Sequence, residues 1–481
     1  MKEVSFMKNK FKTIMSLLII SAITLTFAGT ACKTKDVDGY GNKFKEFSQD
    51  EGVLNTANKL QDNPALPDVE VTEKLRWLSW FPVDETSPTA ELFKAKYGVP
   101  QADSNDKNNV IHVINVTYES RYEQLAALIM GGDAPDMFQF EERNFPYGAY
   151  KNQFQPIDDI IDIYSPEWDP TREYIEMFQW GGKHYCAITE VVNSSSLLFY
   201  RNSIRQEAGL KDPYELWQKG EWTWDTFRQM LQDFSVPDKK WGISSFYLDE
   251  STILTTGIGL ISIEDGRLKN NMDDARIERA MDFLQDLTKN NLRYPYHELS
   301  NYQISPKQFR SGEVLFWGDG PWRYQEEISQ LRDGDNWPDD EICIVPFPRD
   351  PEADDYYQRG KQDALMLVTG SKNANGFKAW TQCAIIAVHD PEMKVVGREK
   401  AKDNFGWTNL QLEAMDAIRD LTPVWDFKNG IGEDVCGVTW ASPVENLTKP
   451  IVTEGATYTQ LREENRGAIE ARIDDINATV D

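Results

Sequence analysis

The chain has 481 residues, of which 40% are hydrophobic and 27% are charged, the composition of an ordinary globular protein. Its formal net charge of −27 argues against a nucleic-acid partner and excludes a polybasic attachment of the whole body to membranes, because both need a basic face. Only four histidines are present, which argues against His-based zinc chemistry, whereas 15 tryptophans exceed the needs of a core and indicate that some face a ligand.

The N-terminus has the pattern of an export signal. Lysines precede an apolar run at residues 14–27, which is shorter than the roughly 20 residues of a membrane-spanning helix. Small residues at 29–31 before Cys32 resemble the lipobox of bacterial lipoproteins, although Gly29 stands where that motif usually has Leu. The resemblance implies that residues 1–31 form a lipoprotein signal peptide and that Cys32 carries a lipid such as palmitate. The alternative is plain secretion with a coincidental cysteine. We expect the polar residues 32–70 to form a flexible tether.

Beyond this tether, short apolar runs alternate with amphipathic segments. Strands are predicted at residues 75–80, 110–116 and 136–140. The second of them is almost entirely apolar, which predicts a strand buried on both faces. Ser87 at an N-cap and Gly98 at a C-terminus predict one helix, and a capping box of Ser120 with Glu123 predicts another that ends at Gly131. This alternation is typical of a parallel α/β sheet.

The alternation resumes further along and predicts a second α/β unit. Further strands are predicted at residues 191–200, 313–317, 343–347 and 364–368. Helices are expected from Asn202 to Gly209 and from Trp222 onward, and a Gly-Pro turn at Gly320 leads into a helix that contains Trp322. A long amphipathic helix closes the chain, with one apolar face formed by Leu461, Ile469, Ile473, Ile476 and Val480.

The cysteines give no disulfide framework. Four lie far apart without CxxC spacing: Cys186, Cys343, Cys383 and Cys436. Three pairings of these four are open, and Cys383, in an apolar helical run, is expected to be a buried free thiol. His112 and His184 lie in apolar strands and are expected to be core or surface residues rather than ligands.

Four segments occur in a recognisable order. They are Ala-Pro-Asp-Met-Phe at 134–138, Leu-Phe-Tyr-Arg-Asn at 198–202 followed by Ala-Gly-Leu at 208–210 and Trp-Thr-Trp-Asp at 222–225, Gly-Glu-Val with Gly-Pro-Trp at 312–322, and Thr-Gly-Ser-Lys-Asn-Ala-Asn at 369–375. Together they resemble family 1 of the extracellular solute-binding proteins, the receptors of ABC sugar importers that include maltose-binding protein. Arg201 departs from the family pattern, which has Asn there, and residues 374–375 replace Pro-Glu.

The resemblance implies a periplasmic-binding-protein type II fold, in which two α/β lobes close on a ligand about crossing hinge strands. Lobe 1 is expected at residues 71–191 plus 364–405, and lobe 2 at 194–362 plus 406–481. It also implies a monomeric, non-enzymatic carbohydrate receptor, anchored on the outer face of the bacterial cytoplasmic membrane, that serves ABC permease subunits and uses neither cofactor nor metal.

Candidate ligand residues follow from chemistry and position. Ligands of parallel α/β sheets bind beyond the carboxyl ends of strands, and sugars need aromatic rings for their C–H faces and carboxylates for their hydroxyls. The candidates are Trp80, Phe140, Glu141, Glu142, Tyr247, Asp319, Trp322 and Trp440. Trp322 leads, since it follows a strand in a Gly-Pro turn and matches the family's stacking tryptophan. The alternative for the aromatic residues is core packing, and for the adjacent glutamates it is simple solvation.

Two other functions stay open. An anchored glycoside hydrolase would need two carboxylates about 5–10 Å apart, and the 78 acidic residues leave that possible. A surface glycan-binding lipoprotein of the largely helical Sus type would serve no permease, but the alternation of strands and helices argues against it.

Overall fold

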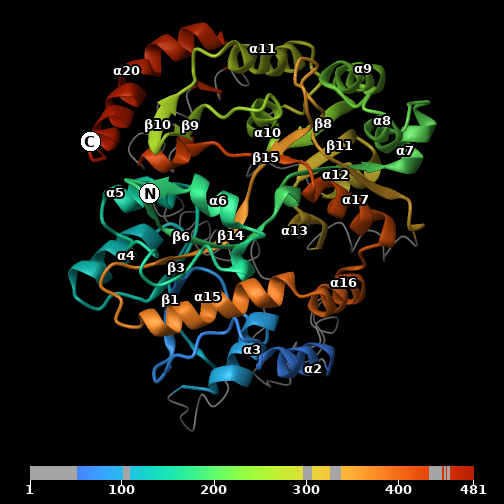
Figure 1. Cartoon of the computed structure of the whole chain (residues 1–481). Coiled ribbons are helices and arrows are strands. Elements are labelled where there is room, and N and C mark those ends of the chain that lie inside the picture. Colours follow the sequence, from blue (N-terminus) through green and yellow to red (C-terminus); the bar gives the residue numbers. More distant parts are fainter. Residues whose placement is uncertain are drawn as a thin grey trace, which may run out of the picture. The chain divides into compact units, whose positions relative to one another are not determined.

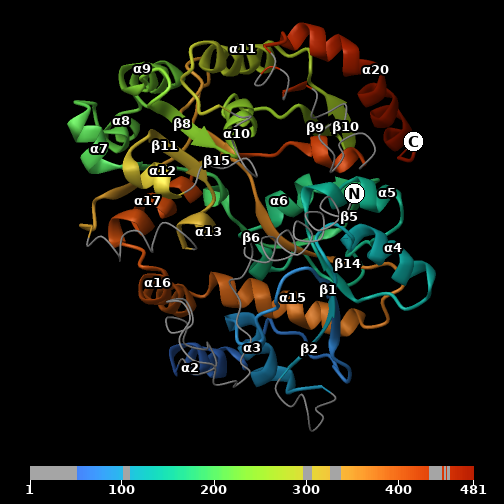
Figure 2. The ribbon, with the colours of Figure 1, turned by 180° about the vertical axis from the view of Figure 1, so that it is seen from behind.

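The computed structural model describes residues 51–100, 109–295, 306–325, 337–432, 447–448, 451 and 455–480 (Figures 1 and 2). Cys32, Cys436 and Trp440 therefore lie outside the described residues. The chain divides into two compact units, one with residues 1–137 and 372–396 and the other with residues 138–371 and 397–481. None of the described helices is long and apolar enough to cross a membrane.

The first unit is built on two parallel strands, β1 (Leu75–Ser79) and β2 (Ile111–Asn115). Its helices are α2 (Glu51–Leu60), α3 (Pro88–Tyr97), α4 (Arg121–Met130) and α15 (Ala374–His389). Helix α15 runs beside α3 in both views, and the ring centroids of Trp380 and Phe93 lie 5.7 Å apart in their interface (Figures 1 and 2). Cys383 on α15 is a buried free thiol, which confirms that prediction.

Local signals predicted the limits of α3 correctly. The Ser87 side chain accepts a hydrogen bond from the backbone N–H of Ala90, and Gly98 ends the helix with φ of 77°, a conformation that glycine adopts without steric cost. Two other predictions in this unit, on the burial of the second strand and on a capping box, were wrong.

The strand at residues 110–116 was expected to be buried on both faces, but only Ile111 of β2 is buried. The reason is its position, since β2 is the outermost strand in the order β2-β1-β3-β14-β6. The predicted capping box at Ser120 does not form, because the Ser120 hydroxyl pairs with Thr117 Oγ1 at 2.8 Å instead. Within the expected tether, residues 51–60 form α2, and Val53 on this helix is buried.

The second unit contains mixed rather than purely parallel sheets. Its four-stranded sheet has the order β12-β7-β11-β8. These strands are β7 (Leu197–Arg201), β8 (Trp241–Ser245), β11 (Val314–Asp319) and β12 (Ile342–Val345). Strand β11 is parallel to β8 and antiparallel to β7, and all six of its residues are buried. Antiparallel β6 (Cys186–Val191) and β14 (Gln362–Leu367) form a second pair in this unit.

Shorter strands and many helices complete the second unit. The boundary between the units falls inside β3 (Met137–Gln139) and inside α16 (Pro391–Phe405). The remaining strands are β4 (Gln179–Trp180), β5 (Lys183–His184), β9 (Ile261–Glu264), β10 (Arg267–Asn270), β13 (Tyr357–Arg359) and β15 (Thr422–Val424). The α-helices are α5 (Tyr147–Tyr150), α6 (Arg172–Met177), α7 (Asn202–Glu207), α8 (Pro213–Gln218), α9 (Trp224–Phe234), α10 (Leu248–Leu254), α11 (Ala275–Lys289), α12 (Pro306–Ser311), α13 (Pro321–Arg323), α17 (Asn409–Arg419) and α20 (Tyr458–Asn477).

Most predicted elements of this unit are present. The predicted extended stretch at 191–200 is interrupted by a 3₁₀ turn, η4 (Asn193–Ser195), between β6 and β7. Other 3₁₀ turns are η2 (Glu142–Asn144), η3 (Pro166–Trp168) and η7 (Phe427–Ile431). His184 is buried and bonds Asp158 Oδ1 through Nδ1 at 2.8 Å, as a core histidine does.

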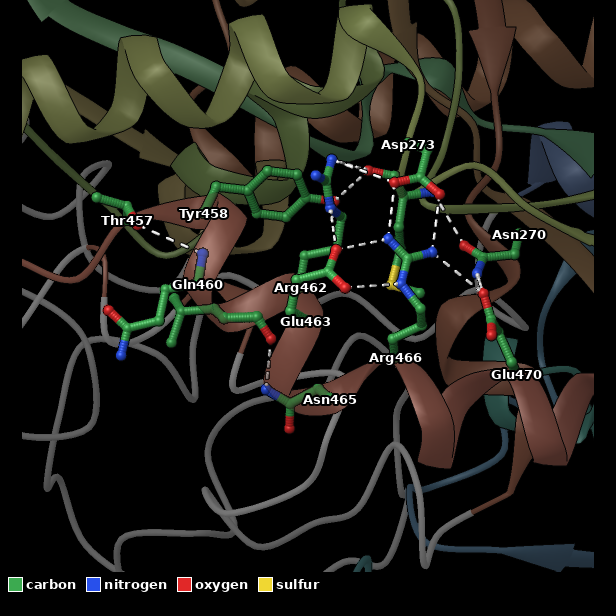
Figure 3. A network of polar contacts seen from close by, with 12 residues as sticks. Asn270, Asp273, Thr457, Tyr458, Gln460, Arg462, Glu463, Asn465, Arg466 and Glu470 are labelled. Carbon is green, nitrogen blue, oxygen red and sulfur yellow. Dashed lines mark hydrogen bonds and ion pairs between the residues drawn. The ribbon is translucent and has the colours of Figure 1, made fainter.

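The closing helix α20 is held by both packing and charge. Four of the predicted apolar residues are buried on one face of this helix: Leu461, Ile469, Ile473 and Ile476. Figure 3 shows the polar contacts near its N-terminal half, where Arg466 donates to both carboxylate oxygens of Asp273 at 2.7 Å. Arg462 approaches the same carboxylate at 3.3 Å, and Tyr458 donates to the carbonyl of Met272 at 2.9 Å.

Candidate functional site

The candidate site lies at one edge of the four-stranded sheet of the second unit. Strands β8 and β11 are parallel, with Ser245 opposite Gly318, so their carboxyl ends reach the same edge (Figure 1). Strand β7 is antiparallel, so its amino end, preceded by Ser195, lies at this edge too. Side chains that follow β8 and β11 and precede β7 are thereby brought together, in the position where α/β sheets bind ligands.

After β11 the chain makes a tight turn into α13. Gly320 is the N-cap, and a Cβ on this residue would lie 2.2 Å from Trp322 Nε1, so the indole occupies the space that a larger residue at position 320 would need. Trp322 is half-buried, and the Arg323 guanidinium lies 5.1 Å from its ring centroid. Arg323 in turn lies 3.6 Å from the carboxylate of the fully buried Asp319. The Gly-Pro-Trp sequence thus presents a partly exposed indole that packs on Gly320 and on the guanidinium of Arg323.

After β8 two aromatic residues follow in sequence. Phe246 is 48% exposed, which is unusual for a phenylalanine, and its ring meets that of Tyr247 edge-on at 4.9 Å. The backbone N–H of Tyr247 donates to Ser245 Oγ at 3.1 Å, which fixes the turn. Trp322 and these two residues give the edge of this sheet the aromatic surface that the C–H faces of a sugar can cover.

Beneath Tyr247 lies a cluster of charged side chains from four segments. Arg359, at the end of β13, donates from Nε to Glu250 Oε2 at 3.0 Å and from Nη2 to Glu142 Oε1. Its guanidinium carbon lies 5.2 Å from the Tyr247 ring centroid, a cation–π geometry. Lys428 Nζ lies 3.7 Å from Glu250 Oε1, the carboxylate oxygen other than the one that Arg359 contacts. We call Glu142, Glu250, Arg359 and Lys428 the Arg359 cluster.

A close backbone approach lets η7 reach this cluster. A Cβ on Gly430 would lie 1.9 Å from the carbonyl oxygen of Phe145, so glycine is required where η7 passes η2. The approach places Asn429 Nδ2 at 3.2 Å from Glu142 Oε2, and it brings Lys428 next to Glu250.

The two carboxyl groups of the cluster have pKa values displaced in opposite directions. Burial raises the pKa of Glu142, and Arg359 offsets only part of this effect. Burial acts in the same direction on Glu250, but Arg359 and Lys428 together outweigh it and lower its pKa to about 2. Glu142 therefore takes up a proton first as the pH falls, while Glu250 stays ionised.

The structure brings together four of the eight predicted residues: Glu142, Tyr247, Asp319 and Trp322. Asp319 is fully buried and accepts a hydrogen bond from the N–H of Gly320 at 2.8 Å, so it stabilises the turn beneath Trp322. Phe140 is 8% exposed and packs edge-on against Phe178 at 5.5 Å, while Glu141 is half-buried at the start of η2.

Trp80 lies in the first unit, directly after β1, and Trp440 lies outside the described residues. The indole of Trp80 is half-buried and meets Phe81 edge-on at 5.2 Å. The guanidinium of the buried Arg121 lies 5.3 Å from the Trp80 ring and 3.6 Å from the ring of Tyr118. Trp80 is therefore held by cation–π and ring contacts within its own unit.

Sequence reasoning missed Phe246, Glu250, Arg359 and Lys428. Phe246 follows β8, a strand that was not predicted, and recognising this strand would have brought Phe246 under the positional rule that selected Trp322. No local signal marks the three charged residues, because their partners are distant in sequence. The described residues contain no group of three or more His, Cys, Asp or Glu that could hold a metal ion.

The fold and this sheet edge define a two-unit α/β ligand-binding protein, and comparison with known families is more specific. Residues 101–383, more than half of the chain, match the family model for bacterial extracellular solute-binding proteins. The chain therefore belongs to this family, which confirms the resemblance read from its sequence. A search of curated protein sequences finds no match.

Solved structures show the same type II periplasmic-binding-protein fold. An ABC substrate-binding protein from Listeria monocytogenes in complex with cycloalternan matches with a TM-score of 0.58 and 14% identity, over 85% of this chain and 99% of that one. The sugar-binding protein MalE from Xanthomonas citri gives 0.57 and 18%, over 84% and 98%. The GacH receptor of Streptomyces glaucescens, described unliganded and with acarbose, gives 0.56 and 15%, over 84% and 100%. The predicted fold class is thereby confirmed.

Proposed function

We propose that this solute-binding protein captures a sugar or oligosaccharide and delivers it to the permease of an ABC importer. The observation that carries the proposal is the edge of the four-stranded sheet, where Phe246 and Tyr247 follow β8, Trp322 follows the adjacent β11, and the Arg359 cluster contacts the Tyr247 ring. Exposed rings next to fixed carboxylates suit a pyranose, which has apolar C–H faces and a rim of hydroxyls.

The fold neighbours support this ligand class. Three of these structures are complexes with cycloalternan, maltotetraose and acarbose, all of them carbohydrates or carbohydrate-like. The lobes expected at residues 71–191 plus 364–405 and at 194–362 plus 406–481 belong to the proposal, as does their closure on the ligand. Small-angle scattering tests closure, since the radius of gyration should fall when ligand is added.

A thermal-shift screen tests the ligand class directly. The chain without residues 1–32 is heated with maltotetraose, acarbose, cellotetraose, xylotetraose or mannotetraose, each at millimolar concentration. A bound sugar raises the melting temperature by mass action, by an increment that grows with sugar concentration. Trp322→Ala serves as the matched control and should give a smaller shift at the same sugar concentration. No shift with any sugar, at concentrations where a known receptor responds, contradicts the proposal.

We further propose that the chain is a lipoprotein anchored through Cys32 on the outer face of the cytoplasmic membrane. The support is the apolar run followed by small residues and Cys32. Expressed from its full gene, the protein should pellet with membranes and incorporate a labelled fatty acid, and Cys32→Ser should release it. A variant that stays in the membrane fraction, with no label on the original, rules out the anchor.

One observation favours a second candidate, a glycoside hydrolase. Glu142 and Glu250 share one guanidinium and have pKa values displaced in opposite directions, a pattern found in acid/base pairs. We nevertheless propose binding without hydrolysis, since the family consists of binding proteins. Chromatography of the sugar panel after long incubation decides, because reducing-end products that disappear in Glu142→Gln would establish the hydrolase.

A further inference from the structure

Each of the three guanidinium nitrogens of Arg359 donates a hydrogen bond to a neighbouring side chain. Its Nε donates to Glu250 at 3.0 Å, its Nη2 to Glu142, and its Nη1 to Ser195 Oγ at 3.4 Å. The residue is only 9% exposed. A buried cation needs such partners, and because the guanidinium is planar, three contacts through three nitrogens leave it a single orientation. Arg359 is therefore a rigid support rather than an arm that can swing to a ligand.

The two carboxylates on Arg359 are not equivalent. Glu250 lies between two cations, with Arg359 on Oε2 and Lys428 at 3.7 Å from Oε1, and its side chain is 17% exposed. Glu142 is 26% exposed, and one hydrogen bond reaches each of its oxygens, from Arg359 and from Asn429. A carboxylate has about four acceptor positions, so both carboxylates keep acceptor capacity, but Glu142 is the more exposed of the two and contacts one cation instead of two.

We propose that Arg359 is a positioning residue of the binding site, which holds Glu142 as the ionised acceptor for ligand hydroxyl groups while Glu250 balances the charge. This inference rests on the proposed function and deepens it, since it assigns a direct ligand contact to one carboxylate and a supporting role to three other charged residues. Arg359 itself does not touch the ligand.

The assignment predicts how affinity depends on pH. Glu142 is faced by Arg359 from β13, Glu250 from α10, and Lys428 with Asn429 from η7. Burial raises the pKa of Glu142, and Arg359 opposes this rise. Affinity should therefore fall as the pH drops through the Glu142 pKa, and weakening the Arg359 contacts should move that midpoint to higher pH.

The test uses the sugar of the named panel that gives the largest thermal shift, with the dissociation constant measured by calorimetry from pH 4 to pH 8. Arg359→Lys keeps the positive charge but loses the planar guanidinium that reaches Glu142 and Glu250 together. Glu142→Gln keeps the side-chain shape but loses the negative charge. We expect each to weaken binding by about 10- to 100-fold at neutral pH, the value of a charged hydrogen bond. Arg359→Lys should raise the pH midpoint, and Glu142→Gln should abolish the pH dependence.

The matched control is Asp273→Asn, which removes another arginine-bound carboxylate of the same unit and should change neither affinity nor midpoint. Circular dichroism confirms that each variant is folded. A folded Arg359→Lys with unchanged affinity and midpoint overturns the inference while leaving sugar binding intact, as does Glu142→Gln with unchanged pH dependence. Absence of binding by the wild-type chain to every sugar overturns the proposed function, and the inference with it.

Discussion

Gly318 of β11 faces Ser245 of β8 so closely that a Cβ on Gly318 would lie 2.3 Å from Ser245 Oγ and 2.5 Å from its Cβ. The Ser245 side chain also shapes the turn after β8, because Ser245 Oγ accepts a hydrogen bond from the N–H of Tyr247. The packing of β8 against β11 is thus linked, through Gly318 and Ser245, to the geometry of the aromatic edge, by which we mean Phe246, Tyr247 and Trp322.

Gly318→Ala is expected to destabilise the protein and to weaken sugar binding. The added methyl must push Ser245 away, and overpacking of this kind typically costs about 1–3 kcal/mol. Urea unfolding measures the stability, and calorimetry measures the affinity. Gly132→Ala is a contrasting variant, since no atom lies within 4 Å of a Cβ there and any cost comes from its φ of 72° alone. Unchanged stability and affinity in Gly318→Ala would show that the strands relax freely.

The second prediction concerns Phe246 of the aromatic edge, whose loss should affect sugar binding more than stability. Phe246 is 48% exposed, so Phe246→Ala should change the free energy of unfolding by less than about 0.5 kcal/mol. Its loss should nevertheless weaken sugar binding, by about fivefold or more if the ring covers a sugar face.

Trp322→Ala should weaken binding further, by roughly thirtyfold, as expected for an anchor worth about 2 kcal/mol. Core packing predicts the reverse pattern, with a large loss of stability and an unchanged affinity. Melting temperature and dissociation constant, measured on both variants, separate these cases. Normal affinity in both would remove the aromatic edge from the site.

Features set by neighbouring residues could be predicted from the sequence. The limits of α3 follow from Ser87 and Gly98, and the turn into α13 follows from Gly320, because caps and turns act over a few residues. The burial of β2 could not be predicted, since it depends on which strand lies at the edge of the sheet. The capping box at Ser120 shows that local signals can also compete, because the hydroxyl of Thr117, three residues earlier, pairs with the Ser120 hydroxyl instead.

The contrast between local and long-range features also explains which residues of the candidate site could be predicted. Trp322 was predicted because it follows a predicted strand, whereas β8, the strand before Tyr247, was not among the predicted strands. Arg359 was not predicted, because its partners Glu142 and Glu250 lie 217 and 109 residues away along the chain. Pairing over such separations is decided by the fold, and a sequence with 78 acidic residues offers many equivalent partners.

Glu250 gives a prediction about stability in acid. Its pKa falls from 4.5 to about 2 on folding, mainly because Arg359 and Lys428 outweigh the effect of burial. A carboxyl with a lowered pKa stabilises the folded state above its unfolded pKa, and this contribution is lost as the pH falls through the folded value. We therefore expect a loss on the order of 3 kcal/mol between about pH 4.5 and pH 2.

Glu250→Gln tests this expectation by urea unfolding across that range. The variant should be less stable at pH 7, because Arg359 and Lys428 lose a shared partner, and its stability should fall less steeply in acid. Glu142→Gln should behave differently, since a raised pKa contributes stability at low pH that is lost as the pH rises through it. Equal acid slopes in wild type and Glu250→Gln would contradict the assignment.

The attachment of α20 gives the last prediction, because it combines two kinds of contact (Figure 3). Asp273 receives both Arg466 hydrogen bonds at 2.7 Å, but its side chain is 63% exposed, so Asp273→Asn should cost only about 0.5–1 kcal/mol. The Tyr458 hydroxyl, in contrast, donates to Met272 in a buried setting, and Tyr458→Phe should cost about 1 kcal/mol. Salt distinguishes them, since ~1 M NaCl screens exposed charges over about 3 Å and leaves a neutral buried hydrogen bond unaffected. Urea unfolding at low and high salt should therefore show the Asp273→Asn difference shrinking while the Tyr458→Phe difference persists. An Asp273→Asn effect that survives high salt would mean that the bidentate geometry, rather than the net charge, holds the helix.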